Sequence, residues 1–430
     1  MRLTSDDREI ARLALPALGA LAAEPLYVLV DTAIVGHLGV APLAALALAG
    51  TLLGGIAALC NFLQYGTTPK VGRLFAAGDE AGAAHLGRQG VILGAGVGIV
   101  LALITAALAG PLVSLFGAPA RVAPLARLYI RLAVIGLPFA LLSVAAEGYL
   151  RGVKRLRVPF QVLLGGNLLN AALEFLFVYG FHWGIAGSAW GTVIAQAAMG
   201  SVFLGMLGRR DPSRPSVDLA VLRSLGRTSS EILVRTGALY AAFLLAGAVL
   251  ARIGAASLAA HQIAFQLWTI LAFALDALAI AAQVMVSHQL GLGERASARR
   301  IAGRIIAWSF AVGVFFCLVM LALASLLPHV FTGNSRVLNR VHAIWLIFAL
   351  MQPVNAIVFA LDGILIGAGD TRFLAWSMLP CSLLAFAPLA VATLAAGWGI
   401  VGVWLALYAF IAARLIATGW RIRGTAWVDH

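Results

Sequence analysis

Charged residues are scarce in this sequence. They make up 11% of its 430 residues, whereas they make up about 25% of a typical soluble globular domain. Hydrophobic residues make up 62%, and the mean hydropathy is +0.98. This composition excludes a water-soluble protein and predicts a membrane protein with many spans.

Cysteine is also rare. Cys60, Cys317 and Cys381 all lie in apolar runs, so we expect free buried thiols and no disulfide framework. Three acids stand among the first ten residues, where a signal peptide carries basic residues, so we expect no cleaved leader.

Catalytic and nucleotide-binding motifs are missing. The sequence has no HExxH, no GxSxG, no paired cluster among its eight histidines and no Walker motif. We therefore expect that the chain is not an enzyme, needs no cofactor and does not use ATP. The string GAGVG at Gly94–Gly98 has no preceding strand, so it predicts close helix packing and not a nucleotide loop.

Long apolar runs take the place of these motifs. A run of about 20 apolar residues is long enough to span a bilayer as a helix. We therefore predict an all-α polytopic membrane protein with twelve transmembrane helices. Six runs lie near 13–37, 43–66, 89–113, 126–150, 158–181 and 185–207. The other six lie near 229–251, 256–286, 302–327, 340–364, 373–396 and 400–420.

The basic residues indicate the orientation of these runs. With the N-terminus inside, 23 Lys and Arg fall on the cytoplasmic side and 6 on the outside, with Arg235 left inside a helix. This bias predicts a multi-pass protein of the cell (cytoplasmic) membrane with both termini cytoplasmic. It also explains the net charge of +13 without nucleic-acid binding.

A polar stretch divides the chain in the middle. Residues 208–228 include Pro212 and Pro215 and predict a cytoplasmic linker. We expect an N-lobe over 1–207 and a C-lobe over 229–430, each with six helices.

The two lobes are copies of each other. When the sequence is compared with itself at an offset of 215 residues, matches run from end to end. Examples are Arg8 with Arg223, Gly39 with Gly254, Pro138 with Pro353, and Trp183 with Trp398. Because each lobe has an even number of helices, the repeats are parallel, and we expect two pseudo-symmetric bundles that face each other across a transport cleft.

The repeat is most informative where it fails. Asp31, Asn170, Glu174 and Thr192 have the apolar counterparts Ala246, Ala385, Leu389 and Leu407. Asp31, Glu174 and Thr192 each lie about two turns from the outer end of their helix, so they sit at similar depth. Tyr129 begins the fourth run on the same side and is placed to cap this cluster.

This set of side chains suits a cation. A carboxylate inside a spanning helix costs about 2.5–3.5 kcal/mol, so such a residue suggests function by default. Two carboxylates close together in a low dielectric cannot both stay charged, so they can hold a proton between them. Carboxylate, amide and hydroxyl oxygens also suit Na⁺. The alternative is a hydrogen-bonded knot that only fixes three helices together.

The first apolar run also contains Pro16 and Pro25. Each proline removes a backbone hydrogen bond and lets the helix bend. We predict that helix 1 bends at these residues.

Other intramembrane charges are open to two interpretations. Glu147 and its counterpart Asp362 are expected to pair with nearby basic residues. Arg235 and Asp276 either form a structural ion pair or meet substrate in the cleft. His261 is expected to be a packed polar residue.

These residues lie in strings that resemble the MATE (multidrug and toxic compound extrusion) family of the MOP superfamily. The strings are PLYVLVDTAIVGHLG, NLLNAALEFLFVYGFHWGIAGSAWGT and DGILIGAGDTRF, and the likeness covers nearly all of the chain. The lone aspartate Asp31, with Arg235 and Asp276, is most similar to the DinF-type branch.

The resemblance implies a fold of two six-helix bundles and export of cationic or amphipathic compounds, driven by inward H⁺ or Na⁺. It places Asp31, Asn170, Glu174, Thr192 and Tyr129 in a cation site. Further candidates for the cleft are Tyr27, Asn167, Arg235 and Asp276. The acid on the fifth helix is commonly Asp in the family and is Glu174 here, which leaves the ion open.

Three functions compete. The first is an antiporter of small molecules that works as a monomer among membrane lipids. The second is a flippase for lipids or lipid-linked precursors, whose cleft would need several basic residues. Arg235 is the only basic residue expected to be clearly buried, which favours the antiporter. The third is an intramembrane enzyme, which the missing motifs disfavour.

Overall fold

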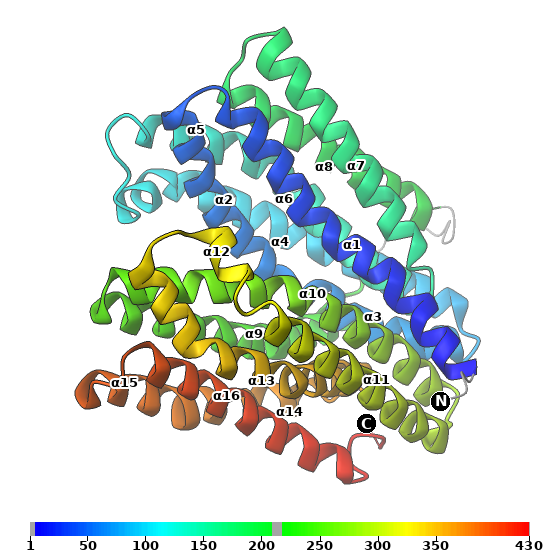
Figure 1. Ribbon diagram of the computed structural model, residues 1–430. Helices are drawn as coiled ribbons and strands as arrows, with labels where there is room; N and C mark the ends of the chain where they lie inside the picture. Colours follow the sequence, from blue (N-terminus) through cyan, green and yellow to red (C-terminus); the bar gives the residue numbers. More distant parts are fainter. Residues whose placement is uncertain (1–4, 209–216, 430) are drawn as a thin grey trace. The chain divides into compact units, whose positions relative to one another are not determined.

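The computed structural model describes residues 5–208 and 217–429, and these residues are almost entirely helical (Figure 1). They contain twelve helices or helix pairs that are long and apolar enough to cross a membrane, as the sequence predicts. Each predicted run lies inside or close to one of these spans. The spans run past the apolar segments into the polar flanks, because a helix does not stop where its hydropathy falls.

In the first half, α1 (Ser5–Gly36), α4 (Glu80–Leu115) and α8 (Ile185–Gly208) each form one span. The others are composite. They pair α2 (Val40–Cys60) with α3 (Phe62–Ala76), α5 (Ala123–Ala133) with α6 (Leu137–Gly152), and α7 (Arg157–Phe175) with a wider helical turn, η2 (Leu176–Gly180).

In the second half, α9 (Leu219–Ile253), α10 (Ala255–Gly291), α11 (Arg295–Ala322), α13 (Ser335–Gly367) and α16 (Gly399–Arg423) each form one span. The remaining span joins α14 (Thr371–Pro380), η3 (Cys381–Phe386) and α15 (Ala387–Ala396), and α12 (Leu327–Phe331) is a short connector. The predicted linker at 208–228 falls partly outside the described residues, and α9 begins within it.

The backbone repeats as the sequence does. Among the described residues, all left-handed backbone conformations except that of Gly117 occur in pairs at the same offset of 215 residues. The pairs are Gly39 with Gly254, Gly78 with Gly293, Lys154 with Gly369, His182 with Gly397, and Gly184 with Gly399. Because only special residues adopt positive φ without cost, a shared set of such turns indicates that both halves use the same connections between helices.

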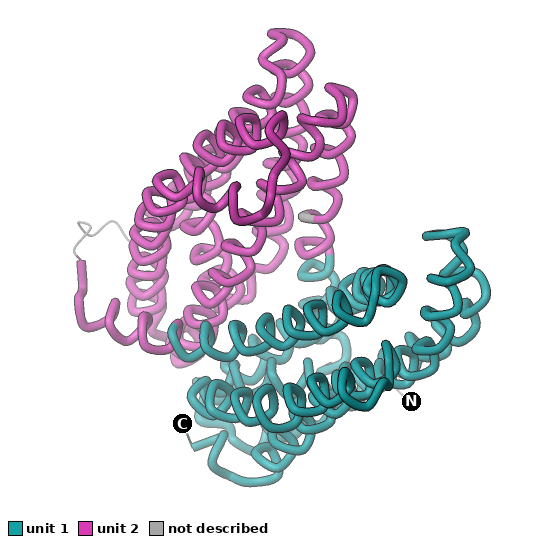
Figure 2. The backbone as a smooth tube through the Cα atoms, turned by 90° about the vertical axis from the view of Figure 1, so that its left-hand side faces the viewer, with its two compact units in different colours: residues 1–18, 230–430 teal, residues 19–229 magenta. Residues whose placement is uncertain are grey.

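The chain forms two compact units, coloured in Figure 2. We call Gly19–Ser229 the N-half unit, and Met1–Leu18 with Ser230–His430 the C-half unit. The first helix of each half therefore begins in the unit of the other half: α1 enters the N-half unit at Gly19, and α9 enters the C-half unit at Ser230.

Specific contacts hold these exchanged helix ends. In the C-half unit, the buried carboxylate of Asp7 accepts two hydrogen bonds of 2.6 Å from Arg304 and one of 2.7 Å from the indole of Trp308. In the N-half unit, the ammonium group of Lys70 donates to the backbone and side-chain oxygens of Ser224 at 2.8 Å. The beginning of α1 is thus tied to α11, and the beginning of α9 to α3.

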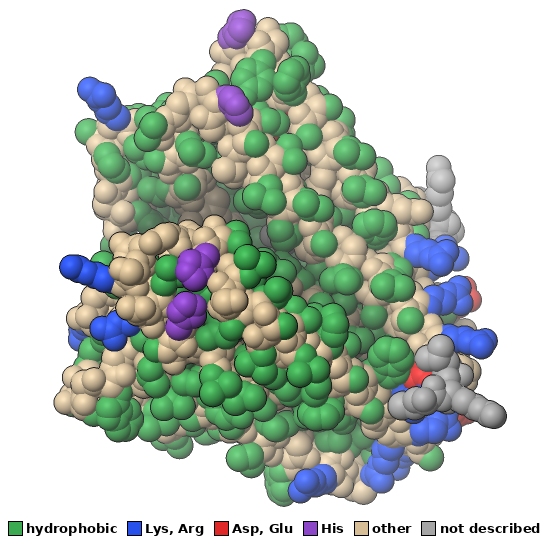
Figure 3. All heavy atoms as spheres, in the orientation of Figure 1, with side chains coloured by type: hydrophobic (Ala, Val, Ile, Leu, Met, Phe, Trp, Pro, Cys, Tyr) green, Lys and Arg blue, Asp and Glu red, His purple; other side chains and the backbone are tan. Residues whose placement is uncertain are grey.

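The outer surfaces of the helices are apolar. Leu103, Phe315, Leu318 and Leu384 are each more than half exposed. On the face drawn in Figure 3, hydrophobic side chains cover the sides of the helices, and Lys and Arg gather toward the helix ends. Such surfaces are stable against lipid tails, so we describe the chain as a multi-pass membrane protein.

Glycines let the helices of each unit approach closely, as the string GAGVG predicts. A Cβ atom added at Gly98 would lie 2.5 Å from the Cα atom of Pro138 on α6. In the C-half unit, a Cβ atom at Gly367 would lie 2.6 Å from the carbonyl oxygen of Gln283, and one at Gly363 would collide with Ala279. Small residues at such contacts allow helix packing by van der Waals forces in lipid.

We expect Gly363→Ala to destabilise the protein by about 1–3 kcal/mol, the usual cost of overpacking. The added methyl group meets backbone atoms of α10, which cannot rotate away. Thermal unfolding in detergent measures the effect. Gly303→Ala on α11 is the matched control, because a Cβ atom there meets open space. Equal unfolding temperatures for the two variants would contradict the close contact.

Candidate cation site

Four helices of the N-half unit bring their polar side chains to one place. Helix α1 provides Tyr27 and Asp31, α5 provides Tyr129, α7 provides Asn170 and Glu174, and α8 provides Ser188 and Thr192. All of these side chains except Tyr27 belong to buried residues. The structure therefore groups Asp31, Asn170, Glu174, Thr192 and Tyr129, the five residues that the sequence places in a cation site.

The two acids lie side by side. Glu174 is completely buried and Asp31 is 5% exposed, so neither side chain points to lipid. Their two carboxyl groups interact electrostatically within the cluster. A direct hydrogen bond between two carboxyl groups needs one proton, because two carboxylates have only acceptor oxygens. An arrangement of this kind can hold a positive ion between its oxygens.

The hydroxyl group of Thr192 connects the rest of the cluster. It donates to Oε1 of Glu174 at 3.5 Å and accepts from the amide of Asn170 at 3.3 Å. It also makes a 3.1 Å hydrogen bond with the hydroxyl group of Tyr27. The buried side chain of Tyr129 lies beside Thr192 and Ser188.

Two acceptor oxygens remain open in this buried network. Among the described residues, Oε2 of Glu174 and Oδ1 of Asn170 have no hydrogen-bond partner. A buried acceptor without a donor is costly, so these oxygens are expected to bind a proton, a water molecule or a metal cation. The described part of the chain has no group of three or more His, Cys, Asp or Glu side chains that could hold a metal. A metal ion here would therefore need the amide and hydroxyl oxygens as ligands.

Gly191 on α8 leaves space for the side chain of Glu174 on α7. A Cβ atom at this position would lie 2.8 Å from Cγ of Glu174. The glycine in the middle of α8 thus allows α7 to approach and leaves room for the glutamate side chain.

Ser188 is a member of the cluster that the sequence analysis missed. It is completely buried and donates a 2.8 Å hydrogen bond to Oδ1 of Asp31. Two signals were available: it lies one turn before Thr192 on the same helix face, and its counterpart at the offset of 215 is the apolar Val403.

Asn167 has a different role from its neighbours on α7. Its amide donates at 3.0 Å to the carbonyl oxygen of Ala23, two residues before Pro25. Further along, the hydroxyl group of Tyr179 donates at 2.7 Å to the carbonyl oxygen of Ile34. Helix α1 is continuous through Pro16 and Pro25, so its bending remains a prediction.

The acids and bases of the second half form a separate cluster. Asp362 on α13 pairs with Arg235 on α9 and, at 2.6 Å, with Arg414 on α16. Asp362 is thus an ion-pair partner of Arg235 that the sequence analysis did not name, while the suggested pair of Arg235 with Asp276 stays a prediction. In the first half, Glu147 pairs with Arg151 at 3.6 Å, as expected.

These pairs correct one sequence argument. Arg235 was predicted to be the only clearly buried basic residue, and Arg414 was counted among the cytoplasmic charges. The first statement is wrong, because Arg414 and Arg151 are each 4% exposed. The side of the membrane on which Arg414 lies stays a prediction. Each side chain reaches a carboxylate inside its unit, and hydropathy alone does not reveal such a partner.

Known proteins resemble this chain over most of its length. Residues 16–176 and 234–412 match the MatE family. Protein DETOXIFICATION 44, chloroplastic, of Arabidopsis thaliana is 32% identical over 93% of this chain and 79% of the relative. DNA damage-inducible protein F of Escherichia coli K12 is 28% identical over 94% of this chain and 89% of the relative.

A solved structure shares the fold. The crystal structure of the Vibrio cholerae MATE transporter VcmN in the bent form superimposes with a TM-score of 0.89. The match covers 99% of this chain and 98% of that chain at 20% sequence identity. With the family match and the plant and bacterial relatives, these findings show that this chain belongs to the MatE family of membrane transporters, whose members are ion-coupled and bind small molecules.

Proposed function

We propose that this protein is a cation-coupled antiporter that exports cationic or amphipathic small molecules by alternating access. The observation that carries this proposal is the buried pair of Asp31 and Glu174, which has open acceptor oxygens beside it. A buried acidic pair is expensive unless it binds and releases a positive ion.

In this mechanism the cation controls α1. With a cation bound, Asp31 and Glu174 attract the same ion and hold α1 against α7. When the cation leaves, two negative groups face each other in a low dielectric and repel. Asp31 then moves, and α1 is the helix that contains Pro16 and Pro25. The hydrogen bond from Asn167 to Ala23 supports the position of α1 just before Pro25.

H⁺ and Na⁺ make different demands on the site. A proton needs only the direct contact between the two carboxyl groups. Na⁺ needs several oxygens around it, and Thr192 and Asn170 supply candidates in addition to the acids. We keep both ions as candidates for the coupling ion.

The pairing of the basic residues favours the antiporter over a lipid flippase. Arg235 and Arg414 share Asp362, and Arg151 pairs with Glu147. Arginines that already bind carboxylates are poor receptors for a phosphate headgroup, because an anion would have to displace the carboxylate.

Transport into proteoliposomes tests the proposal. The purified protein is reconstituted into liposomes, and the transport of ethidium, a planar cation, is measured. A pH gradient is imposed, with Na⁺ or choline as the salt. We expect movement of ethidium against its gradient only when a cation gradient is present. The choline exchange identifies the ion, because export driven by H⁺ survives the loss of Na⁺. Ethidium transport at the same rate with and without the pH gradient and the Na⁺ gradient would refute the proposal.

A further inference from the structure

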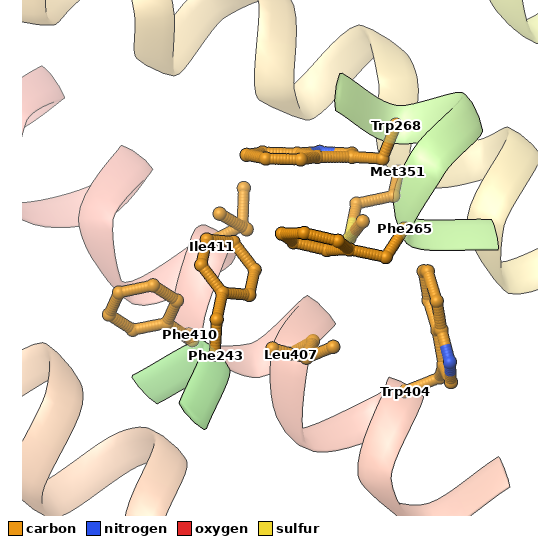
Figure 4. Close-up of a pocket in the computed structure, with 8 residues that line it drawn as sticks. All are labelled: Phe243, Phe265, Trp268, Met351, Trp404, Leu407, Phe410 and Ile411. Carbon is orange, nitrogen blue, oxygen red and sulfur yellow. The ribbon is translucent and has the colours of Figure 1, made fainter. Parts of the chain in front are cut away.

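The C-half unit contains an aromatic cluster around a small hollow (Figure 4). The hollow is lined by side chains of α9, α10, α13 and α16, and it encloses about 290 Å³ of empty space including its mouth. The rings of Phe265 and Trp268 lie nearly parallel, with their centroids 5.7 Å apart. The ring of Phe243 lies 5.1 Å from Trp268, and Trp404 lines another wall.

Buried polar groups surround this aromatic hollow. His261 is 5% exposed, and its ring lies 5.8 Å from Phe265 and 5.7 Å from Trp404. Within the described residues, neither Nδ1 of His261 nor Nε1 of Trp404 has a hydrogen-bond partner. A membrane protein can leave such groups unpaired only at a cost, so both indicate a missing partner.

Asn355 adds the strongest such signal. It is completely buried, and both the nitrogen and the oxygen of its amide lack a hydrogen-bond partner among the described residues. Met351, four residues earlier on α13, lines the hollow. The ring centroid of Phe359, four residues later, lies 6.4 Å from that of Trp268. Because residues four apart share a helix face, Asn355 lies on the face of α13 that is turned toward the hollow.

Some residues of this hollow are the counterparts, at the offset of 215 residues, of residues in or near the cation site. Leu407, which lines the hollow, is the counterpart of Thr192. The large residues around it have small or aliphatic counterparts in the first half: Trp404 matches Ala189, Trp268 matches Leu53, Phe265 matches Gly50 and Asn355 matches Ala140. The two halves thus differ in the chemistry of their buried side chains at these related positions.

We propose that the aromatic hollow of the C-half unit binds a planar aromatic part of the exported molecule, with Asn355 and His261 pairing with polar atoms at its edge. Aromatic faces stack on planar rings and also tolerate positive charge, whereas no lining side chain is charged. At present the hollow has room for about one water molecule, so a ring must displace the half-exposed side chains of Phe243, Phe265 and Trp268.

Binding measurements with Trp268 variants test this proposal. It rests on the proposed export function only where it takes the bound molecule to be the one that is exported. We expect Trp268→Leu to raise the dissociation constant of ethidium for the purified protein by roughly tenfold. Trp268→Phe should restore most of the affinity. Trp376→Leu, which removes an exposed tryptophan of α14, should leave binding unchanged. Transport of tetraethylammonium, an aliphatic cation, should be the same in all of these proteins.

Asn355→Leu separates a binding role from a structural one. If the amide serves a ligand, its replacement by an apolar side chain removes an unpaired buried group, so the unfolding temperature rises while the dissociation constant of ethidium increases severalfold. A lower unfolding temperature, or unchanged ethidium binding in both Asn355→Leu and Trp268→Leu, would overturn the proposal. Ethidium binding that depends on Trp268 without any cation-driven transport would refute the antiporter and leave the hollow as a binding site.

Discussion

Replacing Asp31 with asparagine is expected to lower cation-driven export by about 5- to 150-fold, the range that coupling free energies of 1–3 kcal/mol produce. Asparagine keeps the size of the side chain but cannot change its charge. The hydrogen bond from Ser188 and the contact with Glu174 then no longer depend on a bound cation. The measurement is ethidium export from proteoliposomes over a series of pH values and Na⁺ concentrations.

The control for this experiment makes the same chemical change elsewhere. Asp79 is an exposed acid that caps the beginning of α4 through a 2.8 Å hydrogen bond with Gly82. Asparagine is an equally good cap, so Asp79→Asn should keep full export. Binding of ethidium should survive in Asp31→Asn, since the aromatic hollow lies in the other unit. Unchanged export by Asp31→Asn, with unchanged dependence on both ions, would remove Asp31 from the mechanism.

Replacing Asp362 with asparagine is expected to destabilise the protein by about 3–5 kcal/mol, because it leaves two buried arginines without their shared carboxylate. For a protein of this type the unfolding temperature in detergent should fall by roughly 10 °C. The fall is larger than that for Gly363→Ala, since an uncompensated buried charge costs more than a steric overlap.

A second variant shows that charge is the cause. Adding Arg414→Met to Asp362→Asn removes a buried positive charge that has lost its carboxylate and should restore part of the lost stability. If Asp362→Asn instead keeps the unfolding temperature of the wild type but loses export, then Asp362 and its arginines act on the exported molecule and are not a structural cluster.

The number and approximate positions of the spans follow from the sequence alone. Each span is decided by the local sum of its apolar residues, and that sum needs no knowledge of neighbouring helices. The internal repeat also follows from the sequence, because comparing the sequence with itself at one offset reveals it without any structure. It led to the acidic cluster, since Asp31, Glu174 and Thr192 are the places where one copy departs from the other.

Contacts between distant helices were decided only by the tertiary structure. The sequence gives the charge of Arg414 but not the rotation of α16 that turns it to Asp362, and it does not show that Asp7 is buried against Arg304. The aromatic hollow is assembled from the consecutive helices α9 and α10 and from α13 and α16, which follow much later in the chain. Hydropathy adds up residue by residue, whereas pairing and packing depend on which helix faces meet. The chain therefore determines its spans and its duplication by itself, while folding decides which buried charges are paired and which polar groups are left for a ligand.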